Sequence, residues 1–90
     1  MKVIVNIIGV EVKLKQETLL EPASPVLKDV LRTLKDQDKG QLERFVNEDL
    51  SPVDSSVILV NGRNILSLNG WETHIHDGDE ITFMVPVAGG

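Results

Sequence analysis

Cysteine is absent from the 90 residues, and the chain has no tyrosine, one tryptophan and only two phenylalanines. The lack of cysteine excludes disulfide bonds, thiolate metal sites and a cysteine nucleophile, and it leaves the redox compartment undetermined. Any thiol chemistry that involves this chain must therefore begin on another molecule.

Long hydrophobic runs are also missing, because the apolar stretches span only a few residues and a membrane-spanning helix needs about 20. The N-terminus lacks the apolar core of a signal peptide, so we expect a cytoplasmic protein. Basic residues are outnumbered, with nine Lys and Arg against fourteen Asp and Glu and a net charge of −5. This balance opposes binding to nucleic acid or to a membrane surface; it favours encounter with a basic protein surface or serves solubility alone.

The remaining composition is that of one small globular domain, with 41% hydrophobic and 26% charged residues. A chain of this length needs nearly every apolar residue for a single core, which leaves little for an enclosed active site. No internal repeat, low-complexity tract or linker divides it.

Four segments are typical of β-strands, because they are rich in β-branched residues or alternate apolar with polar residues. They span residues 2–8, 11–19, 57–60 and 80–86. The pair Asn61-Gly62 and the triplet Asp77-Gly78-Asp79 predict tight turns beside the last two strands. The stretch 64–71 is ambiguous and resembles a short edge strand followed by a turn.

One amphipathic helix is predicted between the second and third strands. Ser24 and Pro25 are typical of an N-cap and the first helical residue. Five apolar residues then recur at helical spacing in one stripe: Val26, Leu27, Val30, Leu31 and Leu34. We expect this helix to end within residues 36–39, and a shorter helical segment at 41–47 to bury Leu42, Phe45 and Val46. Strands that flank one main helix predict an α+β roll.

The C-terminus carries the most specific feature of the sequence, VPVAGG at residues 85–90. Two glycines at the last two positions arise by chance in about 0.5% of chains. The five residues Pro86–Gly90 reach roughly 15 to 18 Å when extended, and glycines let such a tail enter a narrow channel. The alternative is a frayed tail with no function.

A terminal carboxylate is a poor electrophile at neutral pH and must be activated before it reacts. The chain has neither GxxxxGK[ST] nor GxGxxG, so we expect it to bind no cofactor, and a separate enzyme to form an acyl-adenylate with ATP and Mg. The activated carbonyl of Gly90 then accepts sulfur to give a thiocarboxylate, or an amine to give an amide.

The order of elements, the segment DGDEITFMVPVAGG at 77–90 and VILVNG at 57–62 resemble the ubiquitin-like sulfur carriers of the MoaD and ThiS type. The resemblance is strongest to the small subunit of molybdopterin synthase. It implies a β-grasp roll over residues 1–85, with a mixed sheet of four to five strands packed on one main helix, and a flexible tail at 86–90. A single proline before the tail, where the small subunit has two, and longer loops at 35–47 and 63–76 depart from the pattern.

By the same resemblance, the chain is a carrier and accessory subunit with no catalytic residues of its own. Gly90 is adenylated by an E1-like enzyme and thiolated by a sulfurtransferase or cysteine desulfurase system, and the large subunit of molybdopterin synthase receives the sulfur. The resemblance assigns two further groups of residues. The tail that threads into the partner is Pro86, Val87, Ala88 and Gly89, and the partner patch is Phe83, Met84 and Val85.

Other candidate sites have simpler interpretations. His74 and His76 precede Asp77, Asp79 and Glu80, but the carboxylates fall in a turn without the spacing of an EF-hand, so we expect no metal. Ser51, Ser55 and Ser56 lack a nucleophile elbow and a positioned base. The single tryptophan, Trp71, is expected at the edge of the core.

The sequence therefore predicts a sulfur carrier, most specifically in molybdenum or tungsten cofactor biosynthesis. Three alternatives stay open: a ubiquitin-like modifier conjugated to lysines, a sulfur carrier for thiamin or another sulfur-containing metabolite, and an interaction domain with an idle tail.

Overall fold

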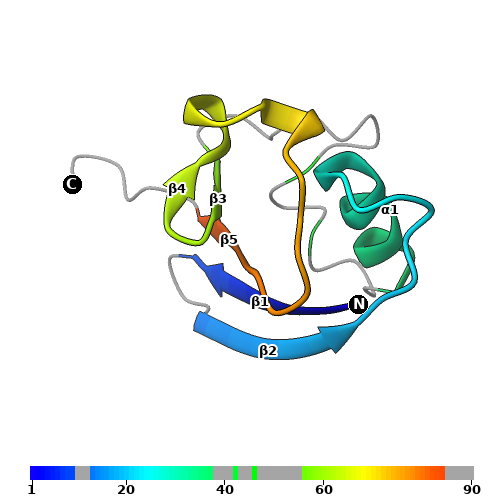
Figure 1. Ribbon diagram of the computed structural model, residues 1–90. Helices are drawn as coiled ribbons and strands as arrows, with labels where there is room; N and C mark the ends of the chain where they lie inside the picture. The colour runs from blue at the N-terminus through cyan, green and yellow to red at the C-terminus, as the bar shows by residue number, and fades with distance from the viewer. Residues whose placement is uncertain (10–12, 38–41, 43–45, 47–55, 85–90) are drawn as a thin grey trace.

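The computed structural model describes residues 1–9, 13–37, 42, 46 and 56–84, and it folds them into one mixed sheet covered by one main helix (Figure 1). The strands are β1 (Lys2–Ile8), β2 (Lys13–Leu19), β3 (Val57–Val60), β4 (Arg63–Asn64) and β5 (Glu80–Met84), the helix is α1 (Leu27–Gln37), and two short 3₁₀ helices are η2 (Ile65–Ser67) and η3 (Gly70–Glu72). The strand order is β2-β1-β5-β3-β4, with β1 parallel to β5 and the other pairs antiparallel. This arrangement confirms the predicted α+β roll.

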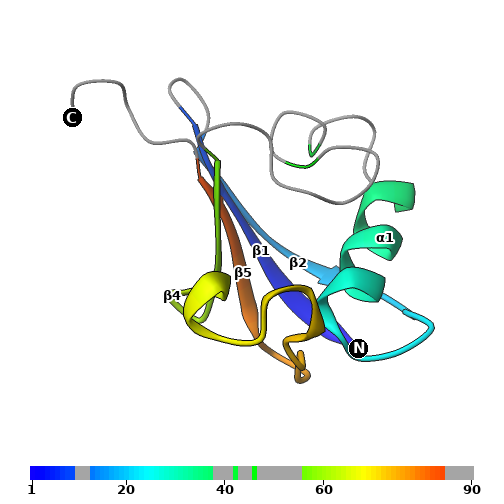
Figure 2. The same cartoon turned by 90° about the horizontal axis from the view of Figure 1, so that it is seen from above.

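The hydrophobic core lies between the sheet and α1 (Figure 2). Alternation along the strands sends every second side chain to this side, including Ile81 and Phe83 of the central strand β5, both 0% exposed. The helix contributes the buried stripe Leu27, Val30, Leu31 and Leu34. Four of the five apolar residues of the predicted stripe are therefore buried, and Val26 is half-buried.

The helix begins two residues later than the sequence predicts, so the assignment of Ser24 as N-cap and Pro25 as first helical residue is wrong. The backbone of residues 25–27 pairs with residues 73–75 instead: Ile75 N donates to Pro25 O at 2.7 Å, and Leu27 N donates to Thr73 O at 2.8 Å. Because these long-range bonds hold the chain extended, the first helical bond runs from Val30 N to Val26 O. The helix ends at Gln37, within the predicted range.

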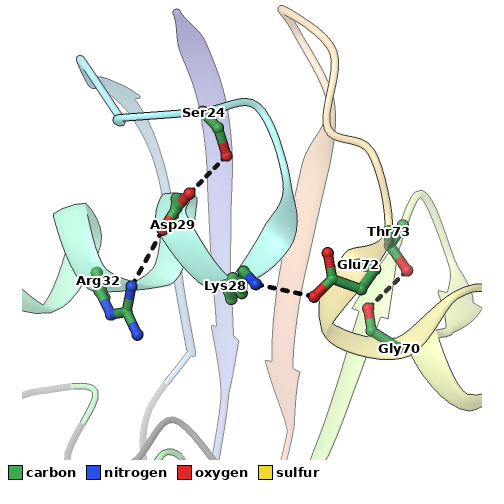
Figure 3. A network of polar contacts seen from close by, with 7 residues as sticks. All are labelled: Ser24, Lys28, Asp29, Arg32, Gly70, Glu72 and Thr73. Carbon is green, nitrogen blue, oxygen red and sulfur yellow. Dashed lines mark hydrogen bonds and ion pairs between the residues drawn. The ribbon is translucent and has the colours of Figure 1, made fainter.

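A polar network fastens the start of α1 to η3 (Figure 3). Lys28 Nζ lies 2.9 Å from Glu72 Oε1, and Ser24 Oγ donates to Asp29, which also accepts from Arg32. Exposed pairs of this kind contribute little by themselves. The buried backbone bond from Leu27 to Thr73 is therefore the stronger part of this attachment.

The ambiguous stretch 64–71 forms the end of β4, then η2 and the start of η3, and the two 3₁₀ helices pack against the core. Ile65 is buried, and Leu68 and Trp71 are half-buried against the core, so the expected place of Trp71 at the core edge is confirmed. Farther back in the chain, Val46 N donates to Leu42 O at 2.9 Å and both side chains are buried, as predicted. Phe45 lies outside the described residues.

Both predicted turns are present. Asn61 and Gly62 have φ values of 52° and 83°, the pair of positive angles that a type I′ hairpin turn requires. Gly78 has φ of 90° in the turn before β5. Within the part of the chain that the structure describes, no helix is long and apolar enough to cross a membrane.

Candidate functional site

The tail residues predicted to react or to thread into a partner, Pro86, Val87, Ala88, Gly89 and Gly90, lie outside the described residues, as does Val85. The structure does place the strand that leads to them. β5 lies in the centre of the sheet, between β1 and β3, and ends at Met84 beside Ile8 and Val57. The division between domain and tail at residue 85 stays a prediction.

Apolar side chains gather around the end of β5 on the side of the sheet that faces away from α1. Met84 pairs with Ile8 on one side and Val57 on the other, and Leu59 lies two residues along β3 from Val57. All four side chains are half-buried, and together they form what we call the tail-proximal face. A cluster of partly exposed apolar side chains is a candidate for contact with another protein.

Phe83 does not belong to this face, which corrects the predicted partner patch. Its side chain is 0% exposed because strand alternation turns it toward the core, opposite in direction to Met84. Sequence periodicity showed that one of the two residues faces outward without showing which. The structure leaves Met84 as the described member of the patch.

A polar pair interrupts the apolar surface next to Leu59. Thr82 lies on the same outer side of β5, and its hydroxyl is 3.4 Å from Nδ2 of Asn6 on β1. Thr82 is only 4% exposed, so neighbouring side chains cover it. This pair marks the boundary of the tail-proximal face.

Lysines border the same face although the chain carries a net charge of −5. Lys13 pairs with Ile8 across β1 and β2, is exposed, and has no ion pair among the described residues. Lys15 Nζ lies 3.3 Å from Glu80 Oε2, and this ion pair crosses β1 diagonally from β2 to β5. A partner protein whose surface has apolar residues bordered by carboxylates would therefore be complementary to this side of the sheet.

Asp79 immediately precedes β5, at the end of the strand opposite Met84. Burial of this carboxylate by itself raises its pKa, but hydrogen bonds from Asn61 Nδ2 and the His76 backbone N–H, together with the nearby His76 ring, outweigh burial and lower the pKa. Lys2 N also donates to Asp77 Oδ1 at 2.6 Å. These bonds fasten the start of β5 to β1 and to the β3–β4 turn.

The residues considered for metal binding or nucleophilic catalysis do not assemble into a centre in the described ranges. The rings of His74 and His76 are exposed, with centroids 4.8 Å apart, and His76 Nδ1 lies 3.6 Å from Asp79. In residues 1–9, 13–37, 42, 46 and 56–84, no group of three or more His, Asp or Glu residues is placed to hold a metal. Ser51 and Ser55 lie outside these ranges, and Ser56 is half-buried.

Sequence reasoning did not identify Ile8, Val57 and Leu59 as parts of one surface. Each belongs to a recognisable strand, and the alternation in 2–8 separates Ile4 and Ile8 from the core residues. Their meeting around Met84 depends on β5 lying between β1 and β3, which local patterns do not specify.

Comparisons with known proteins match the chain along most of its length. The model of the ThiS family matches residues 5–90. Small archaeal modifier protein 3 of Haloferax volcanii is 39% identical over 62 residues, which are 69% of this chain and 66% of that protein. A putative sulfur carrier protein of Archaeoglobus fulgidus is 45% identical over 51 residues, which are 54% of this chain and 56% of that protein. The chain thus aligns with just under two thirds and just over half the length of these two relatives.

Among solved structures, the crystal structure of SAMP1 from Haloferax volcanii superimposes with a TM-score of 0.73 at 19% identity, covering 100% of both chains. At that identity the likeness shows the fold alone. The predicted ubiquitin-like β-grasp architecture is confirmed by this comparison.

Proposed function

Because the chain belongs to the ThiS family of ubiquitin-like sulfur carriers and modifiers, we propose that it carries sulfur as a thiocarboxylate on Gly90. The carboxylate of Gly90 attacks the α-phosphorus of ATP on an E1-like adenylyltransferase and releases pyrophosphate. A sulfurtransferase or cysteine desulfurase system then presents sulfur as a persulfide, whose terminal sulfur displaces AMP. A thiol reduces the resulting acyl disulfide and releases the thiocarboxylate. The ATP and its Mg ion belong to the activating enzyme, and this chain is its substrate.

The observation that carries this proposal is the Gly89-Gly90 pair within a family match that extends to residue 90. Glycines offer no side chain to obstruct a channel, and the terminal carbonyl stays open to attack. The described fold supports the same function, because β5 delivers the following residues from the middle of a firmly paired sheet.

The tail-proximal face is the surface on which we expect the activating enzyme to dock. Ile8, Val57, Leu59 and Met84 lie where β5 ends, so a partner that covers them also receives the residues that follow. Lys13 stands at the border of this surface and favours a partner with carboxylates there. A partner that docks on this face is therefore also placed to receive the C-terminal tail.

Adenylation is tested by incubating the chain with ATP, Mg and its cognate activating enzyme and measuring pyrophosphate release. We expect release with the full chain and background release with a chain that lacks Gly90. The Leu66→Asp variant is a matched control, because Leu66 is 85% exposed on η2 and lies outside the tail-proximal face. Equal release with and without Gly90 would contradict the proposal.

Thiolation is tested by the intact mass of the protein purified gently from its own host. Exchange of one carboxylate oxygen for sulfur adds about 16 Da, nearly the mass of methionine oxidation, so fragmentation must place the change on Gly90 and not on Met1 or Met84. An unmodified Gly90 in cells that make the activating and sulfur-transfer enzymes would count against the carrier function.

For the sulfur acceptor we propose the large subunit of molybdopterin synthase, on the resemblance of residues 57–62 and 77–90 to its small partner. Thiocarboxylated protein mixed with that subunit and the molybdopterin precursor should yield the dithiolene and return the Gly90 carboxylate. If no dithiolene forms and the thiocarboxylated protein supports thiamin synthesis instead, the sulfur acceptor belongs to the thiamin pathway.

A second function, conjugation to lysine, is favoured by the relative named as a modifier. In that case the activated carbonyl of Gly90 forms an amide with a lysine amine of another protein. Digestion of a cell lysate and a search for lysines that carry a C-terminal remnant of this chain test it. Such remnants are expected for a modifier and should vanish in cells that express the chain without Gly90.

A further inference from the structure

The chain contains the dipeptide Asn-Gly twice, at Asn61-Gly62 and at Asn69-Gly70. In this dipeptide the glycine backbone nitrogen can attack the asparagine side-chain carbonyl, because glycine has no side chain to hinder the approach. Both asparagines are exposed, so access to water does not distinguish them. Their hydrogen bonds do.

The side chain of Asn61 is fixed at both of its polar atoms. Nδ2 donates to Asp79 Oδ1 at 3.0 Å, and Oδ1 accepts from Glu80 N at 3.0 Å. The backbone N–H of Asn61 also donates to Glu80 O at 2.8 Å. Attack on its side-chain carbonyl by the Gly62 nitrogen would require breaking these bonds and opening the turn that connects β3 and β4.

Asn69 has no comparable attachment to the described part of the chain. Its side chain makes no capping hydrogen bond to η3, and no bond joins its amide group to any residue in the described ranges. Among the residues that the structure describes, the hydrogen bonds of Asn69 are those of its backbone: N donates to Thr73 Oγ1 at 3.1 Å and O accepts from Glu72 N at 3.0 Å. Gly70 follows with φ of 55°, a conformation that a residue with a side chain rarely adopts.

We propose that Asn69 is a site of spontaneous deamidation in the folded protein and that Asn61 is protected from the same reaction by its contacts with Asp79 and Glu80. The Gly70 nitrogen forms a bond to Cγ of Asn69, and the side-chain nitrogen leaves as ammonia, which gives a cyclic imide. Water then opens the ring at either carbonyl and yields aspartate or isoaspartate. No oxidant or reductant takes part.

The isoaspartate product lengthens the backbone by one atom between residues 69 and 70, where η3 begins. The same short segment sets the position of Thr73, whose hydroxyl donates to Gly70 O at 2.7 Å and whose carbonyl accepts from Leu27 N at the start of α1. The lesion therefore loosens the attachment of α1 to the rest of the core. This consequence is independent of the chemistry of Gly90.

The two sites are compared within one molecule. The full chain is incubated at mildly alkaline pH, once folded and once in urea, and then digested with trypsin, which cleaves after Arg63 and separates the two dipeptides. Fragmentation locates each mass change and distinguishes Asn61 from Asn69. In the folded chain we expect deamidation at Asn69 to exceed that at Asn61 by roughly tenfold, the effect of one to two hydrogen bonds. In urea the two rates should be similar.

Equal rates in the folded chain, or faster reaction at Asn61, would overturn the proposal. Asp79→Ala removes one partner of Asn61 and should accelerate its deamidation without changing Asn69. The variant Asn69→Asp adds the charge without lengthening the backbone, so its unfolding temperature should stay near that of the unmodified protein while the purified isoaspartate form unfolds earlier. The same unfolding temperature for both would show that backbone lengthening at Asn69 does not weaken the helix attachment.

Discussion

Asn61 donates a hydrogen bond from Nδ2 to Oδ1 of Asp79 at 3.0 Å, and this bond joins the β3–β4 turn to the turn that precedes β5. Asp79 also accepts from His76 N at 2.8 Å. One carboxylate thus connects both turns at the end of the sheet remote from Met84.

This arrangement predicts a stability contribution that acid removes. Hydrogen bonding holds the pKa of Asp79 in the folded chain below the ordinary value of 3.8, so ionised Asp79 stabilises the fold above that pH. As the pH falls below 3.8 toward the folded-state pKa, this contribution is lost. The urea midpoint, measured from neutral to acid pH, should fall across that window.

Asp79→Asn should lower the free energy of unfolding by about 1 kcal/mol at pH 7 and reduce its acid dependence. Asp36→Asn, at an exposed position of α1, serves as the control for loss of a negative charge. Equal acid dependence in Asp79→Asn and the parent chain would refute the assignment.

Substitutions at the adjacent residues 83 and 84 should have different effects, one on stability and the other on docking of the activating enzyme. Phe83→Ala empties a fully buried position and should cost about 3 to 5 kcal/mol of unfolding free energy. Met84→Asp leaves the core untouched, so its unfolding free energy should change far less while pyrophosphate release with the activating enzyme falls. If Met84→Asp reacts at the parent rate, the tail-proximal face is not the docking surface.

Lys13 should affect the rate of encounter with the activating enzyme. Lys13→Glu reverses the charge at the border of the tail-proximal face, and we expect slower association with a weaker response to salt. Lys28→Glu makes the same charge change on α1 and provides the control. Equal slowing by both variants would attribute the effect to net charge alone.

Thr73 should be more important for stability than its position in an irregular segment suggests. The residue is 7% exposed, and its hydroxyl donates to Gly70 O and accepts from Asn69 N. Thr73→Val preserves the shape and removes both bonds, so it should cost about 1 to 3 kcal/mol in urea unfolding. Thr73→Ser retains the hydroxyl and should recover most of that loss.

The sequence predicts most of the fold, because strand alternation and turn residues are local properties. The strands at 2–8 and 57–60, the Asn61-Gly62 turn and the end of the helix are found where expected. The start of the helix is not, since residues 25–27 are held by partners at 73–75 that local propensity cannot reveal. Tertiary pairing overrides the preference of Ser24 and Pro25 for a helix start.

The candidate site was predictable in its chemistry and less so in its surface. The Gly-Gly pair is visible in the sequence and suggests acyl activation. Which of Phe83 and Met84 faces outward, and which residues join Met84, depends on the parallel pairing of β1 with β5, two strands from opposite ends of the chain. Pairing at such separation leaves no periodic pattern in either segment.

That parallel pairing also orders events during synthesis. β1 is made first, yet one of its two neighbours in the sheet is β5, and the bond between Asn6 and Thr82 spans 76 positions. Such long-range pairing must wait until β5 has left the ribosome, so the nascent chain holds β1 with only β2 as a partner for most of translation. An activating enzyme that recognises Ile8, Val57 and Met84 together would find this surface only after β5 has paired with β1 and β3. Only folded chains would then be activated.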